Sequence, residues 1–424
     1  MTPALAATIE SISAQLGMMP PDSSMIQSAF LARTTKTTNL RRLIRVQFCV
    51  ILLYHGGIFM RPRAPISLLR ARLILPLIQT LIVLRIEARK WLINGIVGRL
   101  VLPYMRRRYA ADAMAADRVT YDRLKANRFL PDRVFVQISR RCNLTCSMCG
   151  WQIWKRNKGF MSVDLFKRVI AEMTANGIRN LEFTSAQGEP LLSPHAGECV
   201  RLAIDAGLNV HLNTNCTTLG DRNIRMLAQA AKSGRFTVQA SFSGYDKESH
   251  ESVYVGSRFE DTSKKLQALY QKFDSEGVSD ALAINGIIMD AATKPKHFDY
   301  LRTLGIDTKR VRLSYPDNFA GIVPVGSKDQ QTGIYSFKLG LPYRPLHLCH
   351  LLTSRLVVYD DGQVSACPGR DSENVMNIGD IKTEGFLEMR NGPKYKNMVD
   401  AFMARKIGDM PLCAKCDIPY VLLG

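Results

Sequence analysis

The chain has 424 residues, which is more than one average domain and indicates two or three. An apolar content of 46% is enough for a packed core and excludes a disordered protein. Ten cysteines stand in tight clusters without a regular disulfide framework, which favours metal binding in a reducing compartment.

Positive charge is concentrated in the first quarter of the chain. The net charge is +20, and between Arg33 and Arg108 there are 16 Lys and Arg residues against one acidic residue, Glu87. Residues 1–40 are small and polar, so we expect disorder there. Residues 41–132 are expected to form a basic amphipathic helical segment and a polar linker. Such a concentration of charge predicts an anionic partner surface.

The apolar stretches of the basic segment are short. Val46–Met60 and Leu73–Leu84 carry no formal charge and are bordered by arginines, but neither reaches the roughly 20 apolar residues of a spanning helix. Short apolar helices bordered by arginine suit an anionic membrane interface. We therefore expect a cytoplasmic protein, peripheral on the inner face of the cell membrane. Packing on the protein itself or on a partner subunit is the alternative, and nucleic-acid binding is disfavoured because the segment is too apolar.

Between residues 133 and 316, apolar strands alternate with helical patterns. The candidate strands are Val134–Ser139, Asn180–Thr184, Asn209–Thr214, Thr237–Phe242, Ala281–Met289 and Arg310–Tyr315. The candidate helices are Val163–Ala175, Ala196–Ala206, Asp221–Ala231 and Asp261–Ser275. This alternation predicts an α/β fold with a parallel sheet and right-handed crossovers, and six repeats fit an open, partial (β/α)6 barrel of TIM type. Chemistry in such barrels lies at the carboxyl ends of the strands.

The segment Cys142-Asn-Leu-Thr-Cys146-Ser-Met-Cys149 directly follows the first candidate strand. Three thiols are one ligand short of a structural zinc site. They suit a [4Fe–4S] cluster held by three cysteines, which leaves one iron open to bind a small molecule. The spacing resembles the signature of the radical S-adenosylmethionine (radical SAM) superfamily.

Three further motifs at strand ends are similar to motifs of that superfamily. Gln187-Gly188-Glu189-Pro190 resembles the Gly-Gly-Glu-Pro turn, whose backbone holds the amino group of the methionine. Asn213-Thr214-Asn215-Cys216 resembles Thr-Asn-Gly, and the stretch 239–244 resembles Ser-x-Asp-Gly. The resemblance implies cofactor contacts from Gln187, Gly188, Glu189, Asn213, Asn215, Ser241 and Asn285.

Cys216 replaces the glycine of the Thr-Asn-Gly motif. Some radical SAM epimerases use a cysteine to donate a hydrogen atom, because the S–H bond is weak. Cys216 is therefore a candidate catalytic residue, and the alternative is a small buried hydrophobe.

Four cysteines form a second group in residues 317–424: Cys349, Cys367, Cys413 and Cys416. Such a set suits tetrahedral zinc or a second [4Fe–4S] cluster. The pattern around the first two cysteines resembles the opening of the SPASM auxiliary domain. The chain ends shortly after the last cysteine, which resembles the shortened "twitch" form with one auxiliary cluster, as in aminocyclitol dehydrogenases.

These resemblances imply an enzyme of oxidoreductase or epimerase type. The cluster would cleave S-adenosylmethionine to a 5′-deoxyadenosyl radical, which removes a hydrogen atom from the substrate, with a reduced flavodoxin or ferredoxin as electron donor. A sugar, cyclitol or lipid-linked glycan is the expected substrate. The alternatives are maturation of a ribosomally made peptide and, in another class, a non-enzymatic zinc-binding basic protein.

Overall fold

The computed structural model describes residues 96–150, 155–156, 159–183, 188–314, 320, 346–416 and 418–420. The expected disordered N-terminus and most of the basic helical segment lie outside these residues. The chain divides into two compact units, Met1–Gln79 with Gly424 and Thr80–Leu423, and every described residue belongs to the second. Across the described ranges, no helix is both long enough and apolar enough to cross a membrane.

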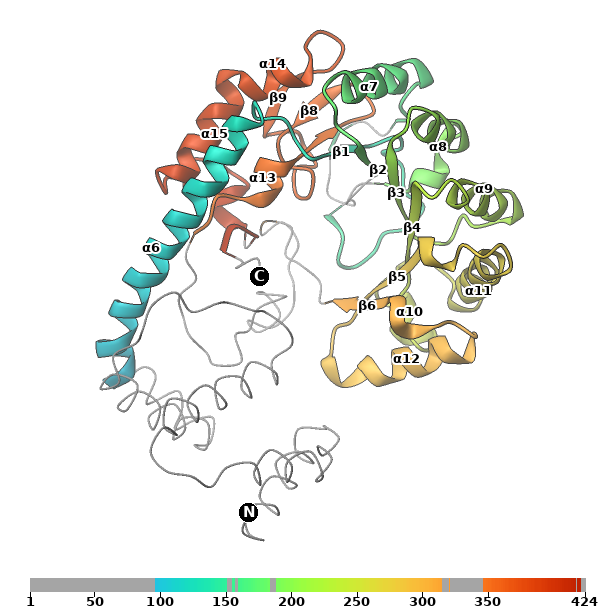
Figure 1. Ribbon diagram of the computed structural model, residues 1–424. Helices are drawn as coiled ribbons and strands as arrows, with labels where there is room; N and C mark the ends of the chain where they lie inside the picture. The colour runs from blue at the N-terminus through green and yellow to red at the C-terminus, as the bar shows by residue number, and fades with distance from the viewer. Residues whose placement is uncertain are drawn as a thin grey trace, which may run out of the picture. The chain divides into compact units, whose positions relative to one another are not determined.

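One open sheet organises the described part of the chain (Figure 1). Its strands are β1 (Arg133–Val136), β2 (Asn180–Phe183), β3 (Asn209–Thr214), β4 (Phe236–Ser241), β5 (Leu282–Ile287), β6 (Val311–Ser314), β7 (Arg355–Val358), β8 (Gln363–Ser365) and β9 (Asn377–Asp380). The order is β6-β5-β4-β3-β2-β1-β7-β8-β9. Strands from β6 to β7 pair in parallel, and β8 and β9 pair antiparallel. The predicted partial barrel of six parallel strands is confirmed, and the C-terminal region extends the same sheet.

Helices cover the outer face of the barrel strands (Figure 1). They are α7 (Val163–Ala175), α8 (Ala196–Asp205), α9 (Asp221–Ala231), α10 (Lys247–Glu251), α11 (Phe259–Ser275) and α12 (Lys294–Thr303). Each of the longer ones buries residues three and four apart, as Ile224, Leu227, Ala228 and Ala231 of α9 show. The observed bounds of β3, α7 and α9 match the predicted ones, because strong local periodicity marks these elements.

Strand alternation separates an apolar face from a polar one. In β3, Val210 and Leu212 are buried under the helices, whereas the alternate residues His211 and Asn213 are half-buried and face the interior of the barrel. Parallel pairing then sets Asn213 beside Gln239 of β4. Because successive side chains of a strand point to opposite faces, the barrel interior receives a row of polar groups.

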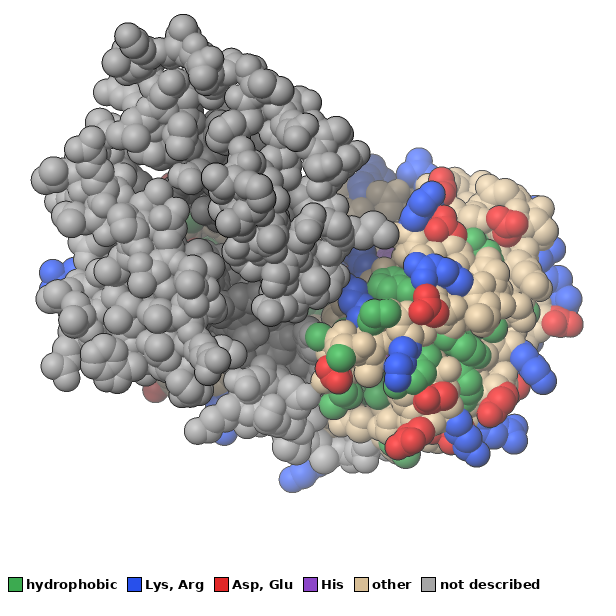
Figure 2. Space-filling view, turned by 90° about the horizontal axis from the view of Figure 1, so that it is seen from below, with side chains coloured by type: hydrophobic (Ala, Val, Ile, Leu, Met, Phe, Trp, Pro, Cys, Tyr) green, Lys and Arg blue, Asp and Glu red, His purple; other side chains and the backbone are tan. Residues whose placement is uncertain are grey.

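The remaining helices belong to the two ends of the described chain. They are α6 (Ile96–Ala126), α13 (His350–Ser354), α14 (Phe386–Asn391) and α15 (Pro393–Met403). Between α6 and α15, Arg405 lies 2.5 Å from the carboxylate of the buried Asp117. On the face in Figure 2, acidic and basic side chains of the described residues are interspersed, without a large patch of one sign.

A buried guanidinium ties α14 to the start of the sheet. Arg390 is fully buried and donates to the carbonyl oxygens of Phe129 (2.6 Å), Leu352 (2.8 Å) and Thr353. Its guanidinium also lies 3.9 Å from the ring centroid of Tyr395. A buried charge is tolerated only when such partners replace water, so Arg390 of α14 joins the segment after α6 to α13.

We expect Arg390→Met to destabilise the protein by about 3 kcal/mol or more, because buried carbonyl groups lose their donors. The thermal unfolding midpoint of the purified protein measures this. Arg302→Met is the matched control, since Arg302 is exposed on α12 and pairs only with the exposed Asp299 in the described residues; it should change stability by less than about 0.5 kcal/mol. Equal midpoints for the two variants would contradict the assignment.

Candidate active site

The first cysteine group lies on a loop that follows β1. Backbone bonds from Thr145 to Val255 and from Ser147 to Val253, both 2.9 Å, attach this loop to the segment after α10. Leu144 is buried there against Val253 and Tyr254, with Cys142 and Cys146 packed on the same apolar cluster. The loop is therefore held at both its backbone and its side chains.

The three thiols of the loop lie close enough to influence one another. Burial raises the pKa of Cys146 strongly, and the neighbouring Cys149 and Cys142 raise it further. Burial also raises the pKa of Cys142. All three thiols are partly accessible. Within the described ranges no three His, Cys, Asp or Glu side chains are arranged to hold a single metal ion. A set of half-buried thiols in apolar surroundings fits the larger iron–sulfur cluster, which takes thiolate ligands.

Glu189 connects this loop to the end of β3. Its carboxylate is buried and accepts from the backbone of Asn215 (2.7 Å), the hydroxyl of Thr214 (2.8 Å) and the backbone of Leu191 (3.2 Å). Burial raises the pKa of Glu189 to about 7, against the lowering effect of these hydrogen bonds. The side-chain amide of the same Asn215 donates from Nδ2 to the sulfur of Cys142, at 3.7 Å.

Gly188 packs directly on the backbone that leads into the cysteine loop. A Cβ at this position would lie 2.3 Å from the carbonyl oxygen of Ser139 and 3.0 Å from that of Arg141, and its φ is +89°. The next residue, Glu189, donates its N–H to the same Arg141 oxygen at 2.7 Å. Glycine is thus required by close approach as well as by conformation. Gln187 lies outside the described residues.

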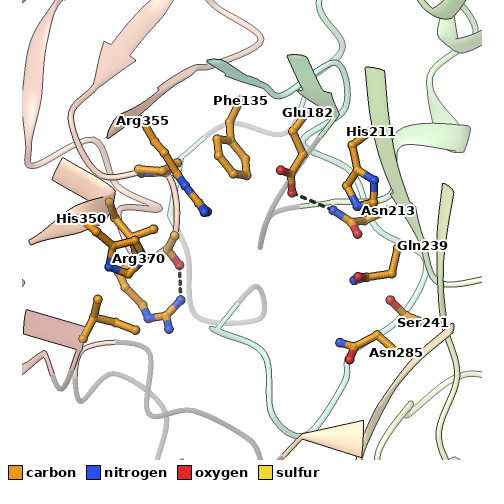
Figure 3. Close-up of a pocket in the computed structure, with 14 residues that line it drawn as sticks. Phe135, Glu182, His211, Asn213, Gln239, Ser241, Asn285, His350, Arg355 and Arg370 are labelled. Carbon is orange, nitrogen blue, oxygen red and sulfur yellow. Dashed lines mark hydrogen bonds between the residues drawn. The ribbon is translucent and has the colours of Figure 1, made fainter. Parts of the chain in front are cut away.

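A cavity of about 390 Å³ opens inside the barrel (Figure 3). Its strand wall consists of Phe135, Glu182, His211, Asn213, Gln239, Ser241 and Asn285, and its C-terminal wall of His350, Leu351, Arg355, Pro368, Gly369, Arg370 and Ile418. The volume is in the range of small-molecule sites.

The strand wall is held in place by its own hydrogen bonds. The carboxylate of Glu182 accepts hydrogen bonds from the guanidinium of Arg133, at 2.6 Å, and from the side-chain amide of Asn213, at 3.1 Å. The Nδ1 atom of His211 lies 2.8 Å from the hydroxyl oxygen of Thr237. Burial lowers the pKa of His211, so at neutral pH the ring is uncharged and offers one donor and one acceptor.

The C-terminal wall brings cationic side chains to the cavity. Arg355 is the first residue of β7, and its guanidinium lies 5.6 Å from the ring centroid of Phe135. Arg370 lies on the loop after β8 and donates a hydrogen bond of 2.9 Å to the carbonyl oxygen of Gly369. His350 stands beside them: burial first, and then the two guanidiniums, lower its pKa to about 4. Its imidazole is therefore neutral next to two permanent positive charges.

The second cysteine group adjoins this wall along the chain, since Cys349 directly precedes His350 and Cys367 directly precedes Pro368. Burial raises the pKa of Cys413 strongly, and the nearby Cys367, Cys349 and Cys416 raise it further, so the four thiols share one locality. The loop with Cys367 is fixed by Asp371, whose carboxylate accepts from Ser365, Val375 and Met376 at 2.7–2.8 Å. Four gathered thiols fit a second iron–sulfur cluster.

The residues that the sequence singled out separate into three places. Asn213, Ser241 and Asn285 line the cavity, and their contact with the cofactor stays a prediction. Gly188, Glu189 and Asn215 surround the backbone near Cys142, and the two carboxylate oxygens of Glu189 are engaged by the chain itself. Cys216 is fully buried in the hydrophobic core with φ +67° and does not line the cavity.

Sequence reasoning missed the charged residues of the described lining and part of its neutral polar residues. Glu182, His211 and Gln239 stand at alternate positions of predicted strands, so a polar residue at every second strand position was the available signal. Arg355 and Arg370 had no such signal, because the pairing of β7 with β1 could not be foreseen from local pattern.

We expect Gly188→Ala to reduce the iron bound per chain after anaerobic reconstitution by at least half, because the added methyl displaces the backbone that leads into the cysteine loop. The matched control is Gly177→Ala, where φ is also positive (+71°) but nothing lies within 4 Å of the added carbon. Gly177→Ala should cost about 1–2 kcal/mol of stability without loss of iron. Equal iron contents in both variants would exclude the steric argument.

Comparison with known proteins agrees with this architecture. Residues 136–290 match the family model described as the radical SAM superfamily, and residues 349–417 match that of SPASM, an iron–sulfur cluster-binding domain. In the solved structure of SuiB from Streptococcus suis bound to S-adenosylmethionine, the fold is similar with a TM-score of 0.51 and 15% identity, over 66% of this chain and 71% of that one. This likeness concerns the fold.

Two curated proteins are similar over part of their length. A tungsten-containing aldehyde ferredoxin oxidoreductase cofactor-modifying protein of Pyrococcus furiosus is 30% identical over 96 residues, 23% of this chain and 27% of that protein. The GTP 3′,8-cyclase of Chlorobaculum tepidum is 32% identical over 139 residues, 32% of this chain and 41% of that protein. The matched part thus spans less than half the length of these relatives. The two family models together establish that the chain belongs to the radical SAM superfamily and carries a C-terminal SPASM iron–sulfur domain.

Proposed function

We propose that this radical SAM enzyme takes a hydrogen atom from a polyhydroxylated substrate, a sugar, a cyclitol or a lipid-linked glycan, and oxidises it. The observation that supports this is the strand wall of the cavity, where six of the seven side chains carry groups that can form hydrogen bonds. Amide, imidazole and hydroxyl groups both donate and accept, as the hydroxyl groups of a sugar do. A site built to bond hydroxyl groups rejects analogues that lack them, because its own polar groups are then left unpaired.

The cofactors follow from the family and the cysteines. Cys142, Cys146 and Cys149 would hold a [4Fe–4S] cluster with an open iron for S-adenosylmethionine, and the backbone at Gly188 and the side chain of Asn215 would border that cofactor. Cys349, Cys367, Cys413 and Cys416 would hold the auxiliary cluster. When bound, these groups supply a 5′-deoxyadenosyl radical and a centre that can take up an electron.

The chain itself would bind and orient the substrate. Glu182 is anchored by Arg133 and Asn213, so its carboxylate presents a fixed acceptor to the cavity. Phe135, Leu351 and Ile418 supply the apolar surface that limits water around the reacting carbon. A pre-arranged set of this kind lowers the barrier by positioning.

The position of Cys216 favours oxidation over epimerisation. Epimerisation requires a hydrogen-atom donor that reaches the substrate, whereas the thiol of Cys216 lies in the hydrophobic core, 3.8 Å from the carbonyl of Thr214. A cavity of about 390 Å³ also suits a small molecule better than a peptide segment, which sets the peptide-maturase alternative second.

A panel of neutral sugars, cyclitols, sugar phosphates, diphosphate-linked sugars and peptides, each given to the reduced holoenzyme, tests this proposal. We expect a sugar-type member to raise formation of 5′-deoxyadenosine at least tenfold above the rate without substrate. Deuterium at the oxidised carbon should appear in the 5′-deoxyadenosine, and a ketone should form. Stimulation by peptides alone would replace this proposal with peptide maturation.

Iron and sulfide analysis tests the cofactor assignment independently of the substrate. Wild-type protein should bind roughly eight irons after anaerobic reconstitution, since two cubanes contain four each. The triple variant Cys142→Ala, Cys146→Ala, Cys149→Ala should retain roughly four. Complete loss of iron in that variant would remove the auxiliary cluster, and a wild type with zinc and no iron would support the zinc-protein alternative.

A further inference from the structure

We propose that the substrate carries a phosphate or diphosphate group, which Arg355 and Arg370 bind at the C-terminal wall of the cavity. This inference rests on the proposed function, since it specifies the class of sugar that the site accepts. It adds an anion subsite to a wall that the hydroxyl-binding groups of the strands do not reach.

The two guanidiniums come from separate elements and converge on one side of the cavity. Arg355 opens β7 and Arg370 lies on the loop after β8, and both line the cavity opposite Asn213, Gln239, and Asn285 (Figure 3). His350 lines the same wall. Two planar cations aimed into one space match the oxygen pattern of a phosphate.

The charge of the cavity lining favours an anion. Among the described residues that line the cavity, there are two arginines and one carboxylate, Glu182. That carboxylate forms its ion pair with Arg133, at 2.6 Å, on the strand side of the cavity. Arg355 is half-buried against Phe135, so a bound anion would be attracted through a medium less polar than water.

The volume of the cavity and the different polarity of its two walls suit a sugar joined to a phosphate. Hydroxyl groups would meet the strand wall, and the anion would meet the opposite wall, which fixes the direction in which the sugar enters. Sugar phosphates, nucleoside diphosphate sugars and prenyl diphosphate-linked sugars share this chemistry. These three classes differ in the group attached beyond the phosphate, so the rates measured with one member of each class can distinguish them.

The competing role for these arginines is to balance the charge of the auxiliary cluster. Both lie a few residues along the chain from an auxiliary cysteine, Arg355 after Cys349 and Arg370 after Cys367. Charge balance predicts a shift in the midpoint potential of the cluster when an arginine is removed. Anion binding predicts a loss of affinity for phosphate groups.

The direct test is calorimetric binding of inorganic diphosphate to the anaerobic holoenzyme at constant ionic strength. We expect at least tenfold weaker binding by Arg355→Met and by Arg370→Met, and intermediate binding by Arg370→Lys, which keeps the charge but loses the planar fork. Arg225→Met, which removes an exposed charge on α9, is the control and should bind as the wild type does. Iron content, measured on each protein, identifies variants that failed to load their clusters.

The second arm uses turnover and separates the three sources. A phosphorylated sugar should support 5′-deoxyadenosine formation at a concentration at least tenfold lower than its neutral counterpart, and this advantage should disappear in both methionine variants. The best member among a sugar 1-phosphate, a nucleoside diphosphate sugar and a prenyl diphosphate-linked sugar in detergent micelles identifies the source.

Two results would overturn the inference: equal use of neutral and phosphorylated sugars by the wild type, or unchanged diphosphate binding in both variants with a shifted cluster potential. Failure of the proposed function is distinct from these. It would show as an absence of stimulation by sugars of either kind, and loss of diphosphate binding in the two variants would then still support the anion subsite.

Discussion

The pairing of β1 with β7 is the constraint on which the site depends. These strands are parallel neighbours in one sheet, with Arg133 opposite Arg355 and Phe135 opposite Val357. Their hydrogen bonds place the C-terminal region beside the first barrel strand, and Arg390 reinforces the junction by binding carbonyl groups from both sides. Without this pairing the strand wall would have no facing wall. The cavity is therefore a product of a continuous sheet and cannot be assigned to either domain alone.

Around the cysteine loop, polar groups serve the fold as much as the cofactor. Glu189 is buried and accepts three hydrogen bonds from the chain, which holds Thr214 and Asn215 against the backbone before Cys142. Gly188 permits that approach because it has no side chain. A motif that resembles a cofactor-binding turn thus also acts as the link between two strand ends. Its rigidity supports pre-organisation of whatever binds beside the thiols.

The cavity has different chemistry on its two walls, and the difference follows from their origins. Barrel strands supply short amides, a hydroxyl and an imidazole, because alternate positions face inward at regular spacing. The C-terminal region supplies long arginines from a strand start and a loop, where side chains can extend further. Our proposals assign the hydroxyl groups of a sugar to the first wall and its phosphate to the second. Two of the auxiliary cysteines adjoin this wall along the chain, since Cys349 directly precedes His350 and Cys367 directly precedes Pro368.

By itself the sequence determined the family, the spacing of both cysteine groups and most barrel elements, because these depend on local periodicity and on motifs of a few residues. β3, α7 and α9 were predicted with their observed bounds. Asn213, Ser241 and Asn285 could be predicted at strand ends because parallel strands bring their carboxyl ends to one edge. Only the tertiary structure decided that Arg355 and Arg370 face those side chains, and that Cys216 lies in the core. Contacts of this kind join residues far apart in the chain, and no local pattern records which distant strand a strand will pair with.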